Sequence, residues 1–456
     1  MHKQICKLAI LIIGIGLLAS RAVAQETPPF GAPDFPWVTG FDLTVPQTGQ
    51  PMPALNARFQ DEVYGTTIQR ISAPIESRSS SWVRHEYSRR PAFNTNSSHI
   101  LMFGDAGWWH LFRVDGEDVV YEKDVPTMAE PNWHPTDPNR YYYFAPFGFG
   151  LQILEYNIVT EQSQVVADFN GRLPWPNIEH VWTGQEGRPS ANGRIWCLMA
   201  EDANYQTLGI FAYDLQTDQI LGTLDMSNDP DHISTSVNGN YCVPSVSDFD
   251  GTGSTMGTRA YTLDFSTFTQ LYSSSSHSDI ALNAAGEDVL VVIDYSTGPD
   301  GGWLKMVHMA TAEVTRLVYN YDNVLSSFYA LHISGLAVDV PGYIVLSTYG
   351  AGLNHGERPA TYGDIWGHDR LAIVELAENP TVYNVAYMHG QRPTNGVAGG
   401  YFGEPHATVN RDLSRILFTS TWESEDANDI RTYMVTLKEP AAKMFAYQLY
   451  LPIARN

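Results

Sequence analysis

One pattern occurs seven times along this chain and constrains its fold more than any other feature. In each repeat, a short apolar or β-branched run reaches a tight turn, and a second run rich in Tyr, Val, Leu and Ile follows. Turn pairs such as Asn192-Gly193 and Asn238-Gly239 are typical of β-hairpins. Successive turns are 42 to 72 residues apart, a spacing that suits four-stranded propeller blades. The turn anchors are Ser97, Asn139, Gly193, Gly239, Gly286, Gly342 and Ser414.

These repeats predict an all-β fold, a seven-bladed β-propeller that spans residues 59–440. No long stretch keeps the 3.6-residue apolar spacing of a helix. The last repeat runs out of strands, and residues 61–73 have a strand pattern of their own. We therefore expect this N-terminal strand to complete the last blade and close the ring, which removes open sheet edges. Residues 25–58 are expected to form an N-terminal extension and residues 441–456 a C-terminal tail.

Residues 1–24 have the pattern of a secretory signal peptide. Lys3 and Lys7 precede or flank the apolar run "LAILIIGIGLL", and the small-residue segment "SRAVAQ" follows it. The run is shorter than the about 20 apolar residues that a membrane span needs, and no later run is long enough. We expect cleavage after Ala24, a secreted or periplasmic protein, and no membrane span.

Two cysteines remain after removal of the signal peptide, Cys197 and Cys242. A disulfide between them would require neighbouring blades to bring the two Cα atoms within about 7 Å. We do not expect this pairing, because two cysteines in so long a chain are not a disulfide framework.

The charge balance narrows the class of partner. The chain has 27 Lys and Arg against 50 Asp and Glu, a formal net charge of −23. This argues against nucleic acid, whose phosphates require clustered cations, and against an anionic membrane surface. An anionic substrate would need a local positive island. The segment "WVRHEYSRRPAFN" is such an island, because Arg84, Arg89 and Arg90 crowd around His85 and Tyr87.

On an extended chain, His85, Tyr87 and Arg89 point to one face, because side chains alternate along a strand. Together they offer a base, a proton donor and a group that binds carboxylate. His110 follows in the segment "GWWHLF", where Trp108 can form a platform for sugar rings. The alternative is an aromatic cluster between blades, with Arg90 as a structural ion-pair partner.

Four histidines lie seven to ten residues before the anchors of four consecutive repeats. In a propeller these positions gather at one mouth of the central channel, so the histidines can hold one divalent ion, together with Asp279 or Cys242. The alternative is a set of hydrogen bonds across a polar channel. The four are His232, His277, His332 and His406.

These residue types suit β-elimination at a uronate. The proton next to the carboxylate is weakly acidic, and its removal creates an enolate-like dianion. An arginine or a metal must stabilise that charge, a base must take the proton, and an acid must cover the leaving oxygen.

Several segments resemble the seven-bladed propeller polysaccharide lyases, over residues 60 to 437. They are "RHEYSRRPAFN", "WWHLF", "EPNWHPTDPN", "SHSDIAL" and "EPHATVNRDLSRILFTSTW". The resemblance is to ulvan lyases first and to oligogalacturonate lyases more distantly. It implies His85 and His110 as a catalytic histidine pair, whereas Tyr87, Arg89 and Arg188 are local candidates. It also implies a metal, either a structural zinc or, as in oligogalacturonate lyases, a manganese near the substrate carboxylate; calcium is a further alternative.

The sequence therefore predicts a secreted lyase that cleaves a uronate-containing anionic polysaccharide and acts as a monomer. Its predicted catalytic residues are His85, His110 and Tyr87. Three alternatives stay open: an oligogalacturonate lyase, a non-catalytic propeller that binds glycan or protein, and a glycoside hydrolase with Glu86 and Glu130 as possible carboxylates. The predicted substrate-binding residues are Arg89, Arg90, Trp108 and Arg188.

Overall fold

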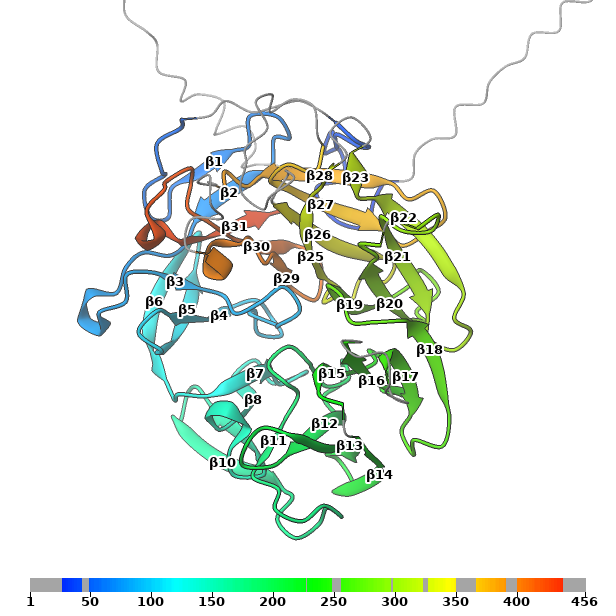
Figure 1. Cartoon of the computed structure of the whole chain (residues 1–456). Coiled ribbons are helices and arrows are strands. Elements are labelled where there is room, and N and C mark those ends of the chain that lie inside the picture. The colour runs from blue at the N-terminus through cyan, green and yellow to red at the C-terminus, as the bar shows by residue number, and fades with distance from the viewer. Residues whose placement is uncertain are drawn as a thin grey trace, which may run out of the picture.

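The computed structural model describes residues 27–42, 49–226, 228–247, 256–296, 298–322, 327–349, 366–390 and 400–437. Within these ranges the chain forms seven antiparallel sheets around a central channel, so the predicted all-β, seven-bladed propeller is confirmed (Figure 1). Six of the sheets have four strands and the seventh has five. The predicted signal peptide and C-terminal tail lie outside the described residues.

Each blade runs from its first strand, nearest the channel, to its fourth strand at the outside. Blades 1 to 3 consist of β3 (Val83–Arg84), β4 (His99–Gly104), β5 (Trp109–Asp115) and β6 (Asp118–Val125); β7 (Ala129–Trp133), β8 (Arg140–Phe144), β9 (Gln152–Asn157) and β10 (Gln162–Asp168); and β11 (His180–Trp182), β12 (Ile195–Glu201), β13 (Thr207–Asp214) and β14 (Gln219–Asp225).

Blades 4 to 6 follow in the same order. They consist of β15 (Pro230–Thr235), β16 (Tyr241–Val246), β17 (Gly257–Thr262) and β18 (Phe268–Tyr272); β19 (Ser278–Leu282), β20 (Asp288–Ile293), β21 (Trp303–His308) and β22 (Val314–Tyr319); and β25 (Ala330–Ser334), β26 (Tyr343–Tyr349), β27 (Arg370–Glu375) and β28 (Val382–Tyr387). The strands β23 (Tyr321–Asp322) and β24 (Ser327–Phe328) form a small hairpin between blades 5 and 6.

The N-terminal strand closes the ring, as predicted. Blade 7 takes β29 (Thr408–Val409), β30 (Arg415–Ser420) and β31 (Arg431–Thr436) from the end of the chain, and β31 pairs with β2 (Thr67–Arg70). The strand β1 (Arg58–Gln60) adds a fifth strand outside β2. In Figure 1 the blue and red strands of this sheet lie side by side. Closure joins the two ends of the chain into one sheet and leaves no blade unpaired.

The core lies between the blades. All seven residues of β12 are buried, because this strand is covered by a neighbouring blade on each face. Burial of one such large apolar side chain contributes about 1.5 to 3 kcal/mol. The cluster between blades 2 and 3 consists mainly of Tyr142, Phe144, Val181, Trp182, Trp196, Leu198, Phe211 and Tyr213.

The expected absence of a disulfide is wrong. Cys197 on β12 and Cys242 on β16 are disulfide-bonded, with their Cα atoms 5.5 Å apart. Both lie near the first residue of the second strand of adjacent blades, so the inter-blade spacing places them opposite each other.

Within the N-terminal extension, Phe30 is fully buried and contacts the rings of Tyr343 and Tyr383 on blade 6. Thr39 also forms a bridge with Tyr383. No helix among the described residues has the length and apolar character to cross a membrane. The helices in this part of the chain are four short 3₁₀ turns, η1 (Glu76–Arg78), η2 (Pro146–Gly148), η3 (Gly400–Gly403) and η4 (Ala427–Asp429).

The two ends of the channel are formed by different parts of each blade. Because the four strands alternate in direction, the start of the first strand and the turn between the second and third strands share one end. We call this end the histidine mouth, because His232 and His332 lie in the first strands β15 and β25, and His277 and His406 lie one and two residues before the strands β19 and β29. The other end, with the turn anchors, is the opposite mouth.

Candidate active site

The basic segment of residues 84–90 leaves blade 1 and enters the channel. β3 ends at Arg84, and the chain rejoins the sheet where Phe93 forms a bridge with Ile100 on β4. In between, side chains of the segment contact blades 2, 3, 4, 6 and 7. The positively charged segment predicted from the sequence therefore occupies the channel at the histidine mouth.

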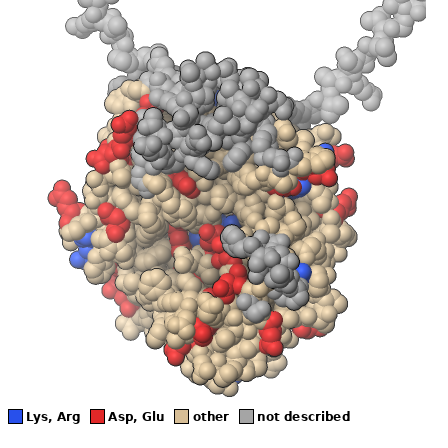
Figure 2. All heavy atoms as spheres, viewed as in Figure 1, with Lys and Arg blue, Asp and Glu red and all other residues tan. Residues whose placement is uncertain are grey.

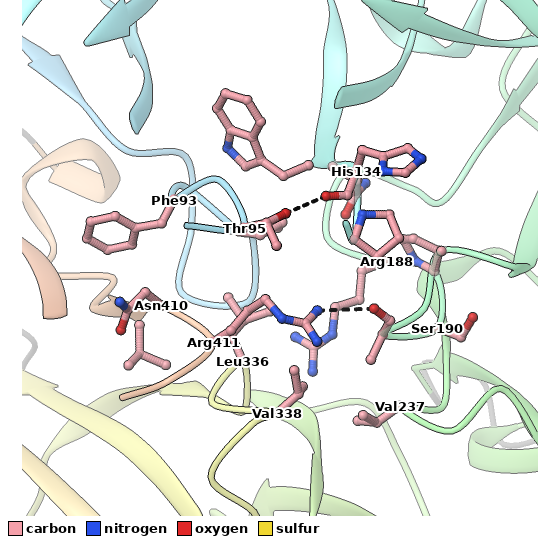
Figure 3. A pocket seen from close by; sticks show the side chains of 18 residues that line it. Phe93, Thr95, His134, Arg188, Ser190, Val237, Leu336, Val338, Asn410 and Arg411 are labelled. Carbon is pink, nitrogen blue, oxygen red and sulfur yellow. Dashed lines mark hydrogen bonds between the residues drawn. The ribbon is translucent and has the colours of Figure 1, made fainter. Parts of the chain in front are cut away.

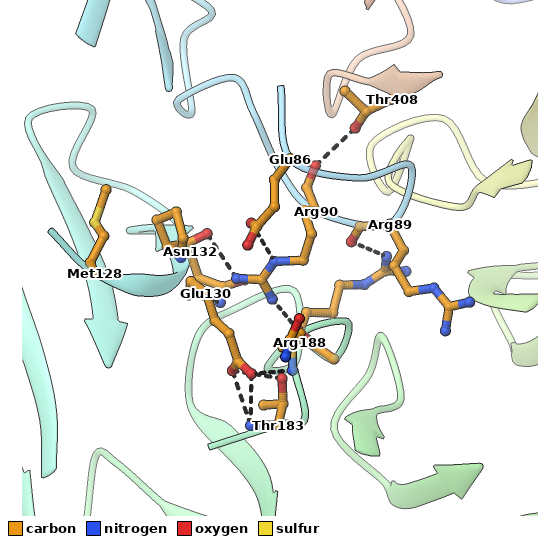
Figure 4. A network of polar contacts seen from close by, with 12 residues as sticks. Glu86, Arg89, Arg90, Met128, Glu130, Asn132, Thr183, Arg188 and Thr408 are labelled. Atoms are coloured by element: carbon orange, nitrogen blue, oxygen red, sulfur yellow. Dashed lines mark hydrogen bonds and ion pairs between the residues drawn. The ribbon is translucent and has the colours of Figure 1, made fainter. Parts of the chain in front are cut away.

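Arg90 is held as a structural ion-pair partner, the alternative to its predicted role in substrate binding. It is 2% exposed, and its Nε donates to Glu86 at 3.0 Å (Figure 4). Its other nitrogens donate to the carbonyls of Pro131, at 3.1 Å, and of Gly187. Burial raises the pKa of Glu86 to about 7 despite the opposing effect of Arg90. All the contacts of this guanidinium are internal, so it links blades 1, 2 and 3.

Glu130 joins blades 2 and 3 below Arg90 (Figure 4). It is 1% exposed, and its carboxylate accepts from the backbone N–H and the hydroxyl of Thr183, at 3.0 and 2.7 Å, and from the backbone N–H of Gln185 at 2.5 Å. Burial raises the pKa of Glu130. This bonding indicates a structural role rather than one half of an opposed pair of hydrolase carboxylates.

Arg89 lies within the histidine mouth and is 3% exposed. Its Nη1 donates to Nε2 of His232 at 2.5 Å, and its Nη2 lies 3.3 Å from the carboxylate of Glu186. Burial lowers the pKa of Arg89, but Glu186 and Tyr87 outweigh this and raise it. Glu186, Asp231 and His232 have the spacing of a cation site, and Arg89 already supplies their positive charge.

A second group at this mouth has the donor set of a metal site. Nε2 of His332 and of His406 lie 2.8 and 3.3 Å from the same oxygen of Glu404, and the three donor atoms all lie within 4.8 Å of one another. Arg84 donates to Nδ1 of His406. Because a guanidinium only donates, this contact leaves the ring proton of a neutral His406 on Nε2, so a metal could bind at Nε2 only if Arg84 moved and the proton were on Nδ1. Burial lowers the pKa of both histidines, so both rings are neutral, the form that binds a divalent ion.

His277 presents a free ring nitrogen beside this group. Its ring lies 4.9 Å from that of His332, and its Nδ1 donates to the carbonyl of Leu331 at 2.7 Å. The proton on Nδ1 leaves Nε2 with a lone pair. Burial, with smaller effects of His332 and Arg89, lowers the pKa of His277 to about 4. A neutral, partly exposed imidazole of this kind can act as a general base.

Tyr87 lies over the same histidines. Its ring centroid is 5.3 Å from that of His332 and 4.9 Å from that of His406, and it stacks on Tyr401 at 6.2 Å. Burial and the carboxylate of Glu186 raise its pKa well above the usual value. Tyr87 therefore keeps its proton near neutral pH and can only act as a proton donor.

The predicted set of four histidines divides in two. His277, His332 and His406 come together, whereas His232 belongs to the separate group around Arg89. The other two ligands considered do not join them. Asp279 forms an ion pair with Arg188 at 2.9 Å, and Cys242 is in the disulfide.

The predicted pair of His85 and His110 is not brought together by any contact between the described residues. His85 is fully buried, and its Nε2 donates to the carbonyl of His406 at 2.6 Å. This bond fixes the chain beside the group of His332, Glu404 and His406. Burial and Arg84 lower its pKa to about 3. His110 lies two strands further out, on β5, where its Nδ1 donates to Asp124 at 2.8 Å. The sequence could not show this, because the segment "GWWHLF" does not reveal how far from the channel its strand lies.

The two remaining predicted binding residues also differ in position. Trp108 is 42% exposed on the turn between β4 and β5, with the guanidinium of Arg78 over its ring at 5.4 Å. Arg188 is 6% exposed and donates to Asp279 and to the carbonyl of Arg89, at 2.9 and 3.2 Å. Arg188 is therefore an internal support of Arg89 rather than an open binding group.

Sequence reasoning missed Glu404, Glu186 and Tyr401. A pattern for the first was present, because Glu404 and His406 are two residues apart in "EPHATVN". The segment is not an extended strand, however, since His406 has a φ of 40°. Nothing comparable marks Glu186, which reaches Arg89 only through the arrangement of the blades.

Acidic side chains are spread over the visible face of the molecule (Figure 2). Near the centre of this view, red and blue atoms occur together. Charges in the channel are therefore mixed and paired within an otherwise acidic surface, as expected for a buried cationic island.

The opposite mouth holds a cavity of about 80 Å³ with a different lining (Figure 3). Apolar side chains such as Val237, Leu336 and Val338 line much of it. Its exposed cation, Arg411, is paired with Asp339 at 3.0 Å and donates to the carbonyl of Ala191 at 3.1 Å. This end offers neither a cluster of imidazoles nor an unpaired charge among the lining residues that the structure describes.

No protein-family model matches the chain, and no curated protein sequence is similar to it. Its fold is similar to that of an oligogalacturonate lyase from Vibrio parahaemolyticus, with a TM-score of 0.54 and 11% identity over 84% of this chain and 96% of that one. It is also similar to an oligogalacturonate lyase in complex with manganese, with a TM-score of 0.55 and 13% identity over 87% and 99% of the two chains. At these identities the likeness shows the fold alone, and closeness to ulvan lyases stays a prediction.

Proposed function

We propose that this protein is a polysaccharide lyase that cleaves beside a uronate by β-elimination at the histidine mouth. The observation that carries the proposal is the meeting of three groups in one place. They are the metal-type set of His332, Glu404 and His406, the free ring nitrogen of His277, and the protonated phenol of Tyr87. The fold shared with oligogalacturonate lyases supports an oligogalacturonate-like reaction over the ulvan-like one expected from the sequence.

In this proposal, Arg89 faces the substrate carboxylate. Its Nε is buried and has no partner among the described residues, and the raised pKa keeps the guanidinium charged. An Arg–carboxylate contact stabilises the charge that builds up when the neighbouring carbon loses its proton. Glu186 would exchange its ion pair with Arg89 for contact with solvent.

His277 takes the proton from the carbon next to the carboxylate, and Tyr87 donates its proton to the departing glycosidic oxygen. The electron pair of the broken C–H bond forms the new carbon–carbon double bond, and the C–O bond to the leaving sugar breaks. The low pKa of His277 makes it a weak base, so the reaction depends on prior neutralisation of the carboxylate.

A divalent cation held by His332, Glu404 and His406 would supply further positive charge for the carboxylate. Two imidazoles and one carboxylate suit manganese or zinc better than calcium, which prefers oxygen ligands alone. Nε2 of His406, one of the three donor atoms, is buried without a hydrogen-bond partner among the described residues, a state that a bound ion would relieve once the ring proton is on Nδ1.

The activity test is a screen with polygalacturonate, oligogalacturonates, ulvan, glycosaminoglycans and alginate, with and without added Mn²⁺ or Zn²⁺. We expect a rise in ultraviolet absorbance from the unsaturated product with at least one of them. His277→Ala should abolish the rise. His308→Ala is the matched control, because His308 lies on the third strand of blade 5 and pairs with Glu287 at 3.4 Å, away from the mouth. No product from any substrate under all these conditions would refute the proposal.

Metal binding is tested separately, by calorimetric titration of the purified protein with Mn²⁺ and with Zn²⁺. We expect one strong site per chain, with affinity reduced about 10- to 100-fold in Glu404→Gln, which keeps the shape of the side chain but removes the charged ligand. Equal affinity in the variant and the unchanged protein would remove this group as the metal site.

A further inference from the structure

Three exposed aromatic rings project from blades 2 and 3 at the same end of the blades as the histidine mouth. Phe147 belongs to η2 and Phe149 directly follows it, in the connection between β8 and β9; Tyr205 lies in the connection between β12 and β13. They are 63%, 59% and 43% exposed. Exposed apolar groups rimmed by polar residues often mark a binding site. We call these three residues the aromatic platform.

The platform rests on a packed floor. Gly148 lies against Trp182 so closely that a Cβ atom would come within 2.7 Å of the indole, and its φ of +71° also favours glycine. The ring of His180 stacks on Tyr205 with centroids 4.1 Å apart, and it meets the edge of Phe149 at 5.4 Å. The exposed rings are therefore held in place by buried ones.

The backbone is strained where it presents these rings. Phe147 has a φ of 59° and Tyr205 a φ of 60°, in the left-handed region that aromatic residues rarely adopt. Each such residue costs on the order of 1 to 3 kcal/mol. His180 Nδ1 donates to the carbonyl of Phe147 at 3.1 Å, and Asp202 accepts from the backbone N–H of Gln206 at 3.1 Å, which fixes both turns. Strain that holds an apolar ring in water indicates a use for that ring.

A short chain of contacts connects the platform to the histidine mouth. Trp182, in its floor, is followed by Thr183, whose backbone and hydroxyl bind Glu130. Glu130 in turn interacts electrostatically with Arg90 in the channel. A polysaccharide that enters the mouth from blades 2 and 3 would therefore cross the platform.

The charged groups around the floor determine which sugar fits. Glu179 precedes His180 and is exposed, and Asp202 begins the turn that carries Tyr205 and is partly exposed. Both carry carboxylates, which accept hydrogen bonds from hydroxyl groups and repel a uronate.

We propose that the aromatic platform binds an uncharged sugar unit of the same polysaccharide whose uronate occupies the histidine mouth. The apolar face of the pyranose ring lies on Phe147, Phe149 and Tyr205, and its hydroxyls face the carboxylates. This inference rests on the proposed function. It keeps the elimination at a galacturonate-like unit and narrows the substrate to a chain in which such uronates alternate with neutral sugars.

The test is affinity electrophoresis through gels that contain the rhamnogalacturonan I backbone, in which galacturonate alternates with uncharged rhamnose, or polygalacturonate, the uronate homopolymer. All proteins carry His277→Ala so that the polymer is not cleaved. We expect Phe147→Ala with Tyr205→Ala to weaken binding of the rhamnogalacturonan about 10-fold and to leave polygalacturonate binding unchanged. Phe268→Ala is the matched control, because Phe268 is 52% exposed on β18, the outermost strand of blade 4, and should have no effect.

The outcomes separate the two proposals. If the double variant binds the rhamnogalacturonan more weakly and the unchanged protein cleaves no polymer, the platform is supported and the lyase activity is refuted. Cleavage with unchanged binding in the double variant refutes the platform alone. Equal weakening for both polymers refutes the neutral-sugar assignment. If the double variant unfolds at a lower temperature than Phe268→Ala, the same binding measurements are made with Phe149→Ala alone and judged by the same criteria.

Discussion

The two mouths of the channel come from the same seven repeats, yet they bury opposite kinds of group. The histidine mouth encloses Arg84, Arg89 and neutral imidazoles. Burial lowers the pKa of Arg84 to about 10 and that of His277 to about 4, whereas Glu186 and Tyr87 raise the pKa of Arg89. The opposite mouth encloses many apolar side chains, with Arg188 and Arg411 held in ion pairs, and the inter-blade disulfide Cys197–Cys242 lies on its side of blades 3 and 4. The comparison indicates that one end of each blade carries the chemistry while the other end stabilises the ring.

The largest expected effect is the difference in activity between two variants, each of which replaces one histidine, at the histidine mouth or at the opposite mouth. His332→Ala removes a partner of Glu404 and a neighbour of both Tyr87 and His277, and we expect kcat/KM to fall about 1000-fold, or about 4 kcal/mol. His134→Ala, in the lining of the opposite mouth, should change it less than about 3-fold. Steady-state kinetics on the best substrate of the screen gives both values. Equal losses in the two variants would contradict the division between the mouths.

The disulfide tests the structural end of the comparison. Replacing Cys197 and Cys242 together with Ser should lower the free energy of unfolding by about 2 to 4 kcal/mol, because the bond closes a long loop across two blades. Chemical denaturation measures this loss. Since neither sulfur approaches the histidine mouth, kcat/KM of the folded double variant should equal that of the unchanged protein. A fall in kcat/KM without a loss of stability would show that the disulfide serves the active site rather than the stability of the ring.

The fold could be predicted from the sequence more completely than the site. Turns such as Asn192-Gly193 recur at blade spacing, so the number of blades, their direction and the ring closure by residues 61–73 all followed from local pattern. The convergence of His277, His332 and His406 followed in turn, because each lies at the same position of its blade.

What could not be predicted depends on distances between segments. The pairing of Cys197 and Cys242 depends on the gap between adjacent blades, and the separation of His85 from His110 depends on which strand of blade 1 each one occupies. Neither the gap between blades nor the strand that a residue occupies can be read from the local periodicity of the sequence. The role of Arg90 was left open for the same reason, because its partners Pro131 and Gly187 lie on other blades.

A smaller effect, on pH dependence, comes from a carboxyl group at the histidine end of blade 3. Glu201 is 5% exposed, and burial raises its pKa to about 7 although Trp182 donates to it at 2.6 Å. Between its unfolded pKa and this value the folded state keeps a proton that the unfolded state releases. The free energy of unfolding should therefore fall by about 1 to 3 kcal/mol as pH rises from about 4.5 to about 7.

Glu201→Gln isolates this contribution, because the amide oxygen can still accept from Trp182 but does not titrate in this range. We expect the difference in unfolding free energy between the unchanged protein and the variant to change with pH over that interval and to be constant above it. Denaturation curves at several pH values measure the difference. Parallel pH profiles for the two proteins would show that Glu201 is not the group responsible.

The smallest expected effect belongs to Arg411, the exposed cation of the opposite mouth. Its guanidinium pairs with Asp339 at 3.0 Å in a partly exposed position, where such a pair contributes about 0 to 1 kcal/mol. Arg411→Ala should thus lower the free energy of unfolding by less than about 1 kcal/mol and leave kcat/KM within about 2-fold. Arginines at the histidine mouth are buried against imidazoles, so the same exchange at Arg89 should cost far more. If Arg411→Ala and Arg89→Ala reduced kcat/KM alike, a substrate would have to contact both ends of the channel, and the two mouths could no longer be treated as separate.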